Sequence, residues 1–192
     1  YIVIPAYNEE MNITSVAREW HTVVETISED SKLVIIDDGS KDSTYQVLTE
    51  LSKELPQLEV ITKKNSGHGA TVLYGYRYAL EQNADYIFQT DSDGQTLPEE
   101  FYGFWELRDK YSAVIGYRNH RKDGFSRVFV TKTLKFVLWC IFKLNITDAN
   151  TPFRLLNRDV LQRHISKIPK DFNLSNVNLG EFSSSNLSVT FI

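Results

Sequence analysis

The sequence predicts an open, mostly parallel α/β sheet with helices on both faces. Short apolar runs of four or five residues alternate with longer segments in which apolar residues recur at spacings of three and four. Repeated strand–helix–strand units imply parallel strands joined by right-handed crossovers. A chain of 192 residues is long enough to bury one substantial core, and no linker or internal repeat divides it. We therefore expect a single domain over 1–192.

The expected elements follow one another in a regular order. Buried strands are predicted at 1–4, 33–36, 58–62, 86–89 and 113–116. Helices are predicted between them at 11–28, 42–55, 69–82 and 98–111, the first with an apolar stripe through Val16, Trp20 and Val23. Beyond them we expect a helix at 125–144, a strand at 153–157, a short helix at 159–165 and a strand at 187–192. The chain stops inside this last strand, so we expect it to be truncated at the C-terminus.

The composition excludes several classes of protein. The formal net charge of -4 hides a division, because residues 1–107 carry 7 Lys and Arg against 19 Asp and Glu, whereas residues 108–170 carry 14 against 4. A uniformly basic nucleic-acid-binding surface is thereby disfavoured, whereas a charge-divided site is not. The single Cys140 excludes an internal disulfide and a cysteine zinc site, and is consistent with a reducing compartment. No run reaches the roughly 18–20 apolar residues of a membrane span.

Four loops carry the residues that suggest chemistry. Ligands of open α/β sheets bind at the carboxyl ends of the strands, so the loops after the first four strands should converge on one edge. Their sequences are Pro5-Ala6-Tyr7-Asn8-Glu9, Asp37-Asp38-Gly39-Ser40, Asn65-Ser66-Gly67-His68-Gly69 and Asp91-Ser92-Asp93-Gly94-Gln95.

The fourth loop is the candidate metal site. Asp91 and Asp93 follow a buried strand in a turn that Gly94 closes, and Gln95 offers a neutral oxygen. Mg²⁺ and Mn²⁺ prefer oxygen ligands and usually bind one or two carboxylates together with substrate phosphates. A solvated turn without a ligand is the alternative interpretation.

The second loop offers two carboxylates and two capping groups. Ser40 or Asp42 is suited to cap the helix that follows. Capping does not require both Asp37 and Asp38, and a carboxylate at the end of a strand is suited to accept hydrogen bonds from a nucleobase or ribose.

The first and third loops give weaker signals. Glu9 and Glu10 precede the first predicted helix, where the helix dipole favours a carboxylate. Gly67 and Gly69 allow a backbone to approach a ligand closely, without the complete spacing of a dinucleotide or phosphate-binding loop. His68 between them is either a ligand contact or a solvent-exposed loop histidine.

Together and in this order, the four loops resemble the family-two glycosyltransferases of the GT-A fold. The match is nearest to the branch of dolichol-phosphate mannosyltransferase and the bacterial polyprenyl-phosphate glycosyltransferases, and it covers nearly the whole chain. The resemblance implies a metal-dependent, inverting hexosyltransferase that uses Mg²⁺ or Mn²⁺. Its donor would be a UDP- or GDP-sugar and its favoured acceptor a polyprenyl phosphate. By this resemblance 1–107 is the nucleotide-sugar and metal half, and 108–192 is the acceptor half.

The resemblance also assigns roles to individual residues. Asp91, Asp93 and Gln95 would hold the metal, and Asp93, Asp148 and Arg118 would be catalytic. Nucleotide-sugar contacts would come from Pro5, Ala6, Tyr7, Glu9, Ile36, Asp38, Asn65, Gly69, Asp91, Ser92, Arg118 and Arg127. The segment Asp148-x-x-x-Pro152-Phe153-Arg154 is similar to the family's Asp-x-x-Ser-Gly-Phe-Arg, but Thr151-Pro152 replaces Ser-Gly. This departure leaves the class of acceptor open.

The sequence also bears on other functions. A glycosyltransferase acting on a saccharide hydroxyl in cell-surface polysaccharide synthesis would need a general base, for which Asp148 is the candidate. Asp148 would otherwise pair with Arg154 or cap a loop. A non-catalytic nucleotide-binding domain is a further alternative. A nucleotidyltransferase is disfavoured, because the first loop lacks the glycines and lysine of an activation loop. Processive synthesis is disfavoured because no Gln-x-x-Arg-Trp follows Asp148.

The helix at 125–144 bears on localisation. Its apolar and aromatic residues are interrupted by Lys132, Lys135 and Lys143. This pattern fits peripheral contact with an anionic membrane surface, and it equally fits a buried helix whose lysines point to solvent. From the resemblance we expect a protein at the cytoplasmic face of a membrane. The sequence does not indicate the oligomeric state.

Overall fold

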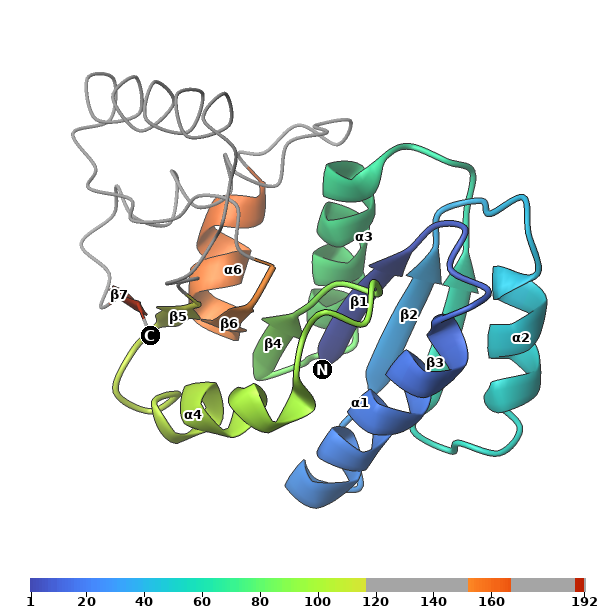
Figure 1. Cartoon of the computed structure of the whole chain (residues 1–192). Helices are drawn as coiled ribbons and strands as arrows, with labels where there is room; N and C mark the ends of the chain where they lie inside the picture. The colour runs from blue at the N-terminus through green and yellow to red at the C-terminus, as the bar shows by residue number, and fades with distance from the viewer. Residues whose placement is uncertain (117–151, 167–188, 192) are drawn as a thin grey trace, which may run out of the picture.

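A seven-stranded sheet lies at the centre of the protein (Figure 1). The computed structural model describes residues 1–116, 152–166 and 189–191. The strands are β1 (Ile2–Ala6), β2 (Leu33–Asp37), β3 (Leu58–Thr62), β4 (Tyr86–Gln89), β5 (Ala113–Ile115), β6 (Arg154–Asn157) and β7 (Val189–Phe191). The helices are α1 (Ile13–Ile27), α2 (Thr44–Leu51), α3 (His68–Glu81), α4 (Phe101–Glu106) and α6 (Arg158–Ile165), with a 3-10 helix, η1, at Pro98–Glu100.

The sheet has the order β3-β2-β1-β4-β6-β5-β7. Strands β1 to β4 pair in parallel, and β7 pairs in parallel with β5, so the mostly parallel sheet is as predicted. Strand β6 is antiparallel to both of its neighbours, β4 and β5. It therefore begins at the edge where β4 and β5 end, and Arg154 pairs with Gln89 on one side and Ile115 on the other.

Two apolar cores lie on the two faces of the sheet (Figure 1). Helices α1, α2 and α4 cover one face, where the ring of Phe88 lies 5.0–5.7 Å from the rings of Phe101, Phe153 and Trp20. Helices α3 and α6 cover the other face, with Val72 and Leu161 in the same cluster. The alternating strands and helices thus bury apolar surface on both faces, as the sequence predicts.

Some boundaries differ from the prediction for physical reasons. Strand β1 continues to Ala6, so Pro5 lies inside it. The amides of Phe88 and Thr90 in the β4 segment donate to the carbonyls of Tyr1 and Val3. The backbone groups of alternate residues point to the same side, so those of Pro5 face β4 as those of Tyr1 and Val3 do. The pairing of β1 with β4 ends at Gln89, so β4 offers no hydrogen-bond acceptor opposite Pro5. Proline, which has no N–H to donate, is therefore tolerated at this position.

Helix and strand ends elsewhere shift by a few residues. The segment 98–111 forms η1 and the short α4 instead of one helix, and α2 spans only Thr44–Leu51. The predicted helix at 125–144 lies outside the described residues, as do Arg118, Arg127 and Asp148. None of the helices within the described ranges has the length and apolar character needed to cross a membrane.

Helix α3 packs unusually close to the sheet. A Cβ atom at Gly75 would lie 2.3 Å from Cγ1 of Val3 and 2.7 Å from Cδ1 of Ile36, both of them fully buried. These separations are shorter than any van der Waals contact, so only glycine permits this approach. Gly75 therefore fixes the distance between α3 and the strands β1 and β2. Helix α3 begins at the carboxyl edge of the sheet, so this packing also positions the start of the helix at that edge.

We predict that Gly75→Ala lowers the free energy of unfolding by about 1–3 kcal/mol, because the added methyl group overpacks the core. The loss should appear even though alanine favours a helix by about 1 kcal/mol over glycine. Urea unfolding followed by circular dichroism measures it. Tyr74→Ala on the exposed side of α3 is the control and should change the stability by about 0.5 kcal/mol or less. Equal effects in both variants would contradict the close-packing explanation.

Candidate functional site at the carboxyl edge of the sheet

Four loops meet where the first four strands end. We call them loop 1 (7–12), loop 2 (38–43), loop 3 (63–67) and loop 4 (90–97), after β1, β2, β3 and β4. Since these strands are parallel, all four loops lie at the same edge of the sheet, as predicted. Hydrogen bonds join loop 2 to loops 1 and 3, and His68 at the start of α3 contacts Asp91 of loop 4, so the edge is a connected structure rather than four separate turns.

Reciprocal hydrogen bonds join loops 1 and 2. The amide of Asn8 donates to Oγ of Ser40 at 2.9 Å, and the amide of Lys41 donates back to Oδ1 of Asn8 at 2.8 Å. The amide of Glu10 donates to Oδ2 of Asp42 at 3.2 Å. Asn8 adopts φ 57°, a left-handed conformation that asparagine tolerates better than most residues. This conformation directs its backbone and side chain toward loop 2.

The start of α2 is also tied to loop 1. The N-cap residue of α2 is Ser43, which makes no side-chain cap hydrogen bond, so neither Ser40 nor Asp42 is the cap. Asp42 accepts the amide of Thr44, the first residue of α2, at 3.0 Å, and Ser40 accepts from loop 1. The expectation that Glu10 serves the first helix is wrong. Helix α1 begins only at Ile13, and Oε2 of Glu10 accepts the amide of Ser43 at 2.9 Å, at the start of α2.

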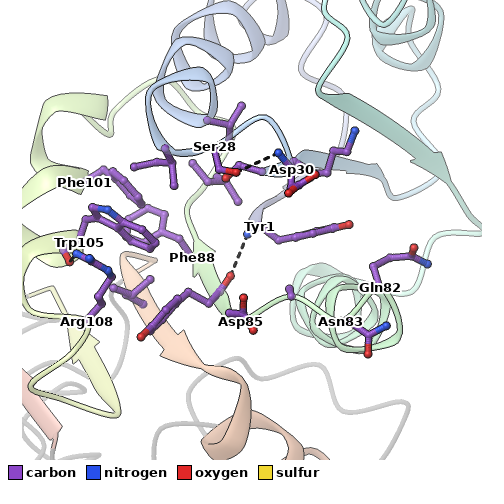
Figure 2. Close-up of a pocket in the computed structure, with 18 of the residues that line it drawn as sticks. Tyr1, Ser28, Asp30, Gln82, Asn83, Asp85, Phe88, Phe101, Trp105 and Arg108 are labelled. Atoms are coloured by element: carbon purple, nitrogen blue, oxygen red, sulfur yellow. Dashed lines mark hydrogen bonds between the residues drawn. The ribbon is translucent and has the colours of Figure 1, made fainter.

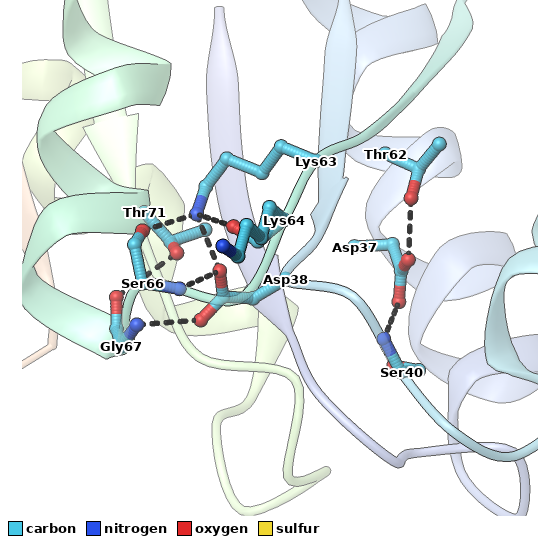
Figure 3. Close-up of polar contacts among 9 residues, drawn as sticks. All are labelled: Asp37, Asp38, Ser40, Thr62, Lys63, Lys64, Ser66, Gly67 and Thr71. Atoms are coloured by element: carbon cyan, nitrogen blue, oxygen red, sulfur yellow. Dashed lines mark hydrogen bonds and ion pairs between the residues drawn. The ribbon is translucent and has the colours of Figure 1, made fainter.

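Asp38 joins loop 2 to loop 3 (Figure 3). Its side chain is buried and accepts hydrogen bonds from Nζ of Lys63, from the amide of Ser66 at 2.9 Å and from the amide of Gly67 at 2.9 Å. Burial raises the pKa of Asp38, but these hydrogen bonds outweigh it and hold the pKa below its ordinary value. The sequence prediction did not include Lys63. Its position was a usable signal, because it directly follows β3, and the pair of aspartates lies at the end of the neighbouring strand β2.

Asp37 fixes the base of loop 2 (Figure 3). It is 2% exposed and accepts the amide of Ser40 at 3.1 Å and the hydroxyl of Thr62 at 2.7 Å. Between these contacts, Gly39 has φ 68°, and a Cβ atom there would lie 2.9 Å from the amide nitrogen of Asn65. Loops 2 and 3 are thus in backbone contact at Gly39.

Loop 4 is a turn held closed at its base. The buried hydroxyl of Thr90 donates to the hydroxyl of Thr96 at 3.0 Å. The amide of Gln95 donates to Oδ1 of Asp93 at 2.9 Å, across Gly94 at φ 69°. Asp93 is exposed in this turn.

The carboxylates at this edge lie close enough to influence one another. Partial burial raises the pKa of Glu9, and the carboxylates of Asp93, Asp42 and Asp91 raise it further. Within the described ranges, no group of three or more Asp, Glu, His or Cys is arranged to hold a metal by itself. Exposed carboxylate oxygens without a complete protein cage fit a hard divalent cation that is held jointly with a diphosphate.

The remaining predicted residues divide into exposed and supporting positions. Tyr7 is 42% exposed at the start of loop 1, where its ring is accessible for stacking. Ile36 has no exposed surface and packs beneath Gly75, so its side chain supports the edge from below. Exposed positions also include Asn65 and Gln95, whereas Pro5, Ala6, Gly69 and Ser92 are buried.

A pocket lined by described residues lies elsewhere. Its volume is about 620 Å³, and it opens at the amino ends of β1 and β4, between α1 and α4 (Figure 2). Tyr1, Asp85 and Trp105 line it, and the amino group of Tyr1 donates to the carbonyl of Tyr86 at 2.9 Å. This pocket is at the opposite end of β1 from Glu9 and loop 4, so we do not assign it to the same chemistry.

The family model described as "Glycosyl transferase family 2" matches residues 1–165, which include all four loops. The chain belongs to glycosyl transferase family 2. A curated relative is the UDP-N-acetylglucosamine–dolichyl-phosphate N-acetylglucosaminyltransferase of Methanococcus voltae, 28% identical over 84% of this chain and 70% of the relative. Another is the undecaprenyl-phosphate 4-deoxy-4-formamido-L-arabinose transferase of Pseudomonas fluorescens, 27% identical over 83% of this chain and 47% of the relative.

Solved structures of low sequence identity share the fold. TarS 1–349 of S. aureus in complex with UDP matches with a TM-score of 0.67 and 18% identity, over 100% of this chain and 56% of that chain. A mannosyltransferase of Pyrobaculum calidifontis in complex with GDP-mannose and Mn²⁺ matches with a TM-score of 0.66 and 15% identity, over 100% of this chain and 53% of that chain. The predicted GT-A fold is thereby confirmed. The present chain spans about half the length of the arabinose transferase and of these two structures.

We predict that Asp38→Asn lowers the free energy of unfolding by about 3 kcal/mol at neutral pH, because it leaves Lys63 without its buried counter-charge. The folded-state pKa of Asp38 lies below its ordinary value. Its contribution is therefore present above about pH 4 and is lost as the pH falls through the folded-state pKa. Urea unfolding at pH 7 and at pH 3 measures the difference between wild type and variant.

The exposed Asp30→Asn is the matched control and should change the stability by about 0.5 kcal/mol or less. A wild-type advantage over Asp38→Asn that stays constant down to pH 3 would show that the ionised carboxylate is not its source.

Proposed function

We propose that this chain is the catalytic domain of an inverting glycosyltransferase that moves a sugar from a nucleotide-sugar to a polyprenyl phosphate with the aid of Mg²⁺ or Mn²⁺. The observation that carries the proposal is the gathering of Asp91, Asp93 and Glu9 at the edge where β1 to β4 end. Open α/β sheets bind nucleotides at this edge. Family membership supports the same type of reaction.

The donor would bind across loops 1 to 4. The exposed ring of Tyr7 offers a stacking surface for a base. Asp38 supports the donor site through loop 3, because its carboxylate already holds the Ser66 and Gly67 amides. Asp91, Asp93 and Gln95 would hold the cation, and Asp93 would be catalytic through it. A bound Mg²⁺ or Mn²⁺ supplies charge neutralisation at the leaving diphosphate.

The transfer itself would be a direct displacement. An oxygen of the acceptor phosphate forms the new bond to the anomeric carbon as the bond between that carbon and the diphosphate oxygen breaks. The electron pair of the broken bond leaves with the nucleoside diphosphate. A phosphate acceptor is already anionic at neutral pH, so this reaction needs no general base. Arg118 and Arg127 are proposed to contact phosphates.

The choice of a polyprenyl phosphate rests on two curated relatives. The names of the Methanococcus voltae and Pseudomonas fluorescens enzymes include a dolichyl phosphate and an undecaprenyl phosphate respectively. We extend this acceptor class to the present chain, with contact at the cytoplasmic face of a membrane through 125–144. A saccharide hydroxyl is the second candidate acceptor, because Thr151-Pro152 departs from the family pattern, and it would require Asp148 as general base.

A donor screen followed by a transfer assay tests the proposal. Thermal shifts with UDP- and GDP-sugars, each with and without Mn²⁺, should identify one donor whose stabilisation requires the metal. The radiolabelled donor should then label undecaprenyl or dolichyl phosphate. Label in a saccharide instead would favour the second acceptor. Tight nucleotide binding without turnover on either acceptor would favour a non-catalytic domain.

We predict that Asp93→Ala lowers metal-dependent transfer by about 100-fold or more, as expected when a group that stabilises the leaving group is removed. The variant should fold normally, because Asp93 is exposed on loop 4. Initial rates at saturating donor and Mn²⁺ measure the loss. Glu99→Ala, an exposed carboxylate six residues further along, is the control and should keep wild-type activity. Full activity in Asp93→Ala would exclude the proposed metal role.

A further inference from the structure

His68 contacts the candidate metal loop directly. Nε2 of His68, the first residue of α3, lies 3.0 Å from Oδ1 of Asp91 in loop 4. An ionised carboxylate only accepts hydrogen bonds, so the imidazole nitrogen is the donor. Two residues 23 positions apart in the chain, one at the start of α3 and one in loop 4, are thus joined at the edge. His68 is therefore not simply a solvent-exposed loop histidine.

The backbone at His68 is firmly positioned. Gly67 has φ 89°, its amide is held by Asp38, and its carbonyl accepts both the amide and the hydroxyl of Thr71 at 3.0 Å. One turn further along, Gly75 fixes α3 against β1 and β2. Although the His68 side chain is 50% exposed, the helix that carries it has little freedom to move away from loop 4.

The carboxylates around Asp91 indicate what this hydrogen bond can do. Asp91 shares the edge with the carboxylates of Glu9 and Asp93, which influence one another in the absence of a cation. A hydrogen bond to Oδ1 fixes the plane of the Asp91 carboxylate and thereby the direction in which its other oxygen is presented. Carboxylates that bind metals are commonly oriented by such outer hydrogen bonds, whose loss lowers metal affinity or activity about 10- to 100-fold.

We propose that His68 is a positioning residue of the metal site, which orients the carboxylate of Asp91 toward the divalent cation by donating a hydrogen bond from Nε2. The inference rests on the proposed function, because it assigns the cation to loop 4. It adds the first residue of α3 to a site that would otherwise consist of loop 4 residues. In this arrangement, α3 connects the nucleotide side of the edge to the metal side.

Three substitutions separate positioning from a simple surface contact. His68→Ala removes the donor. Gln and Asn carry the same amide group, but the amide nitrogen of Gln reaches about as far as Nε2 of His, whereas that of Asn reaches only about as far as Nδ1. We expect His68→Gln to stay within about 3-fold of the wild-type Mn²⁺ affinity, and His68→Ala and His68→Asn to lose about 10- to 100-fold.

Binding of Mn²⁺, alone and with UDP or GDP, is measured by the electron paramagnetic resonance signal of the free ion. Thermal unfolding without metal should be similar in all four proteins, since an exposed pair contributes about 1 kcal/mol at most. Unchanged Mn²⁺ affinity in His68→Ala, or an equal loss in the Gln and Asn variants, would overturn this inference alone. Absence of Mn²⁺ binding in wild type would overturn the metal dependence of the proposed function as well.

Discussion

The buried carboxylate of Asp38 and its donors hold the binding edge in place. A carboxylate removed from water is strongly destabilising unless charges and hydrogen bonds compensate it. Here the compensation comes from Lys63 and from the backbone of Ser66 and Gly67, which all belong to loop 3. If loop 3 moved away, the buried carboxylate of Asp38 would lose these partners. Helix α3 begins directly after loop 3. The conformation of one loop is thereby coupled to the stability of the core.

From this anchor the remaining contacts extend along the edge. Asp37 fastens loop 2 to β3, Asn8 and Glu10 fasten loop 1 to loop 2, and His68 reaches loop 4. Carboxylates that repel one another are thus held in a fixed arrangement before any ligand arrives. Such preorganisation is what electrostatic stabilisation of a leaving group requires, because little reorganisation is then needed during the reaction.

The sequence was most informative where local pattern decides structure. Strands β2 to β4 are apolar runs that polar loops interrupt, and their prediction was correct to within one residue. The prediction ended β1 before Pro5. A proline is tolerated inside this strand only because the pairing with β4 has already ended, and the sequence alone does not show where that pairing ends. The insertion of β6 between β4 and β5, and the contacts of Lys63 and His68, depend on residues distant in the chain. Spacing alone identifies such side chains as polar loop residues but does not reveal their partners.

The antiparallel strand β6 has a consequence for the nascent chain. Strands β1 to β4 and their helices are complete by residue 89, but the free side of β4 is filled only when 154–157 has been synthesised. Until then β4, which leads into loop 4, presents an unpaired edge of the kind that promotes aggregation. Folding of this family member therefore depends on a late strand that pairs with the free edge of β4 and joins β5 to the sheet. The first residue of β6 is the buried Arg154, which pairs with Gln89 directly before loop 4.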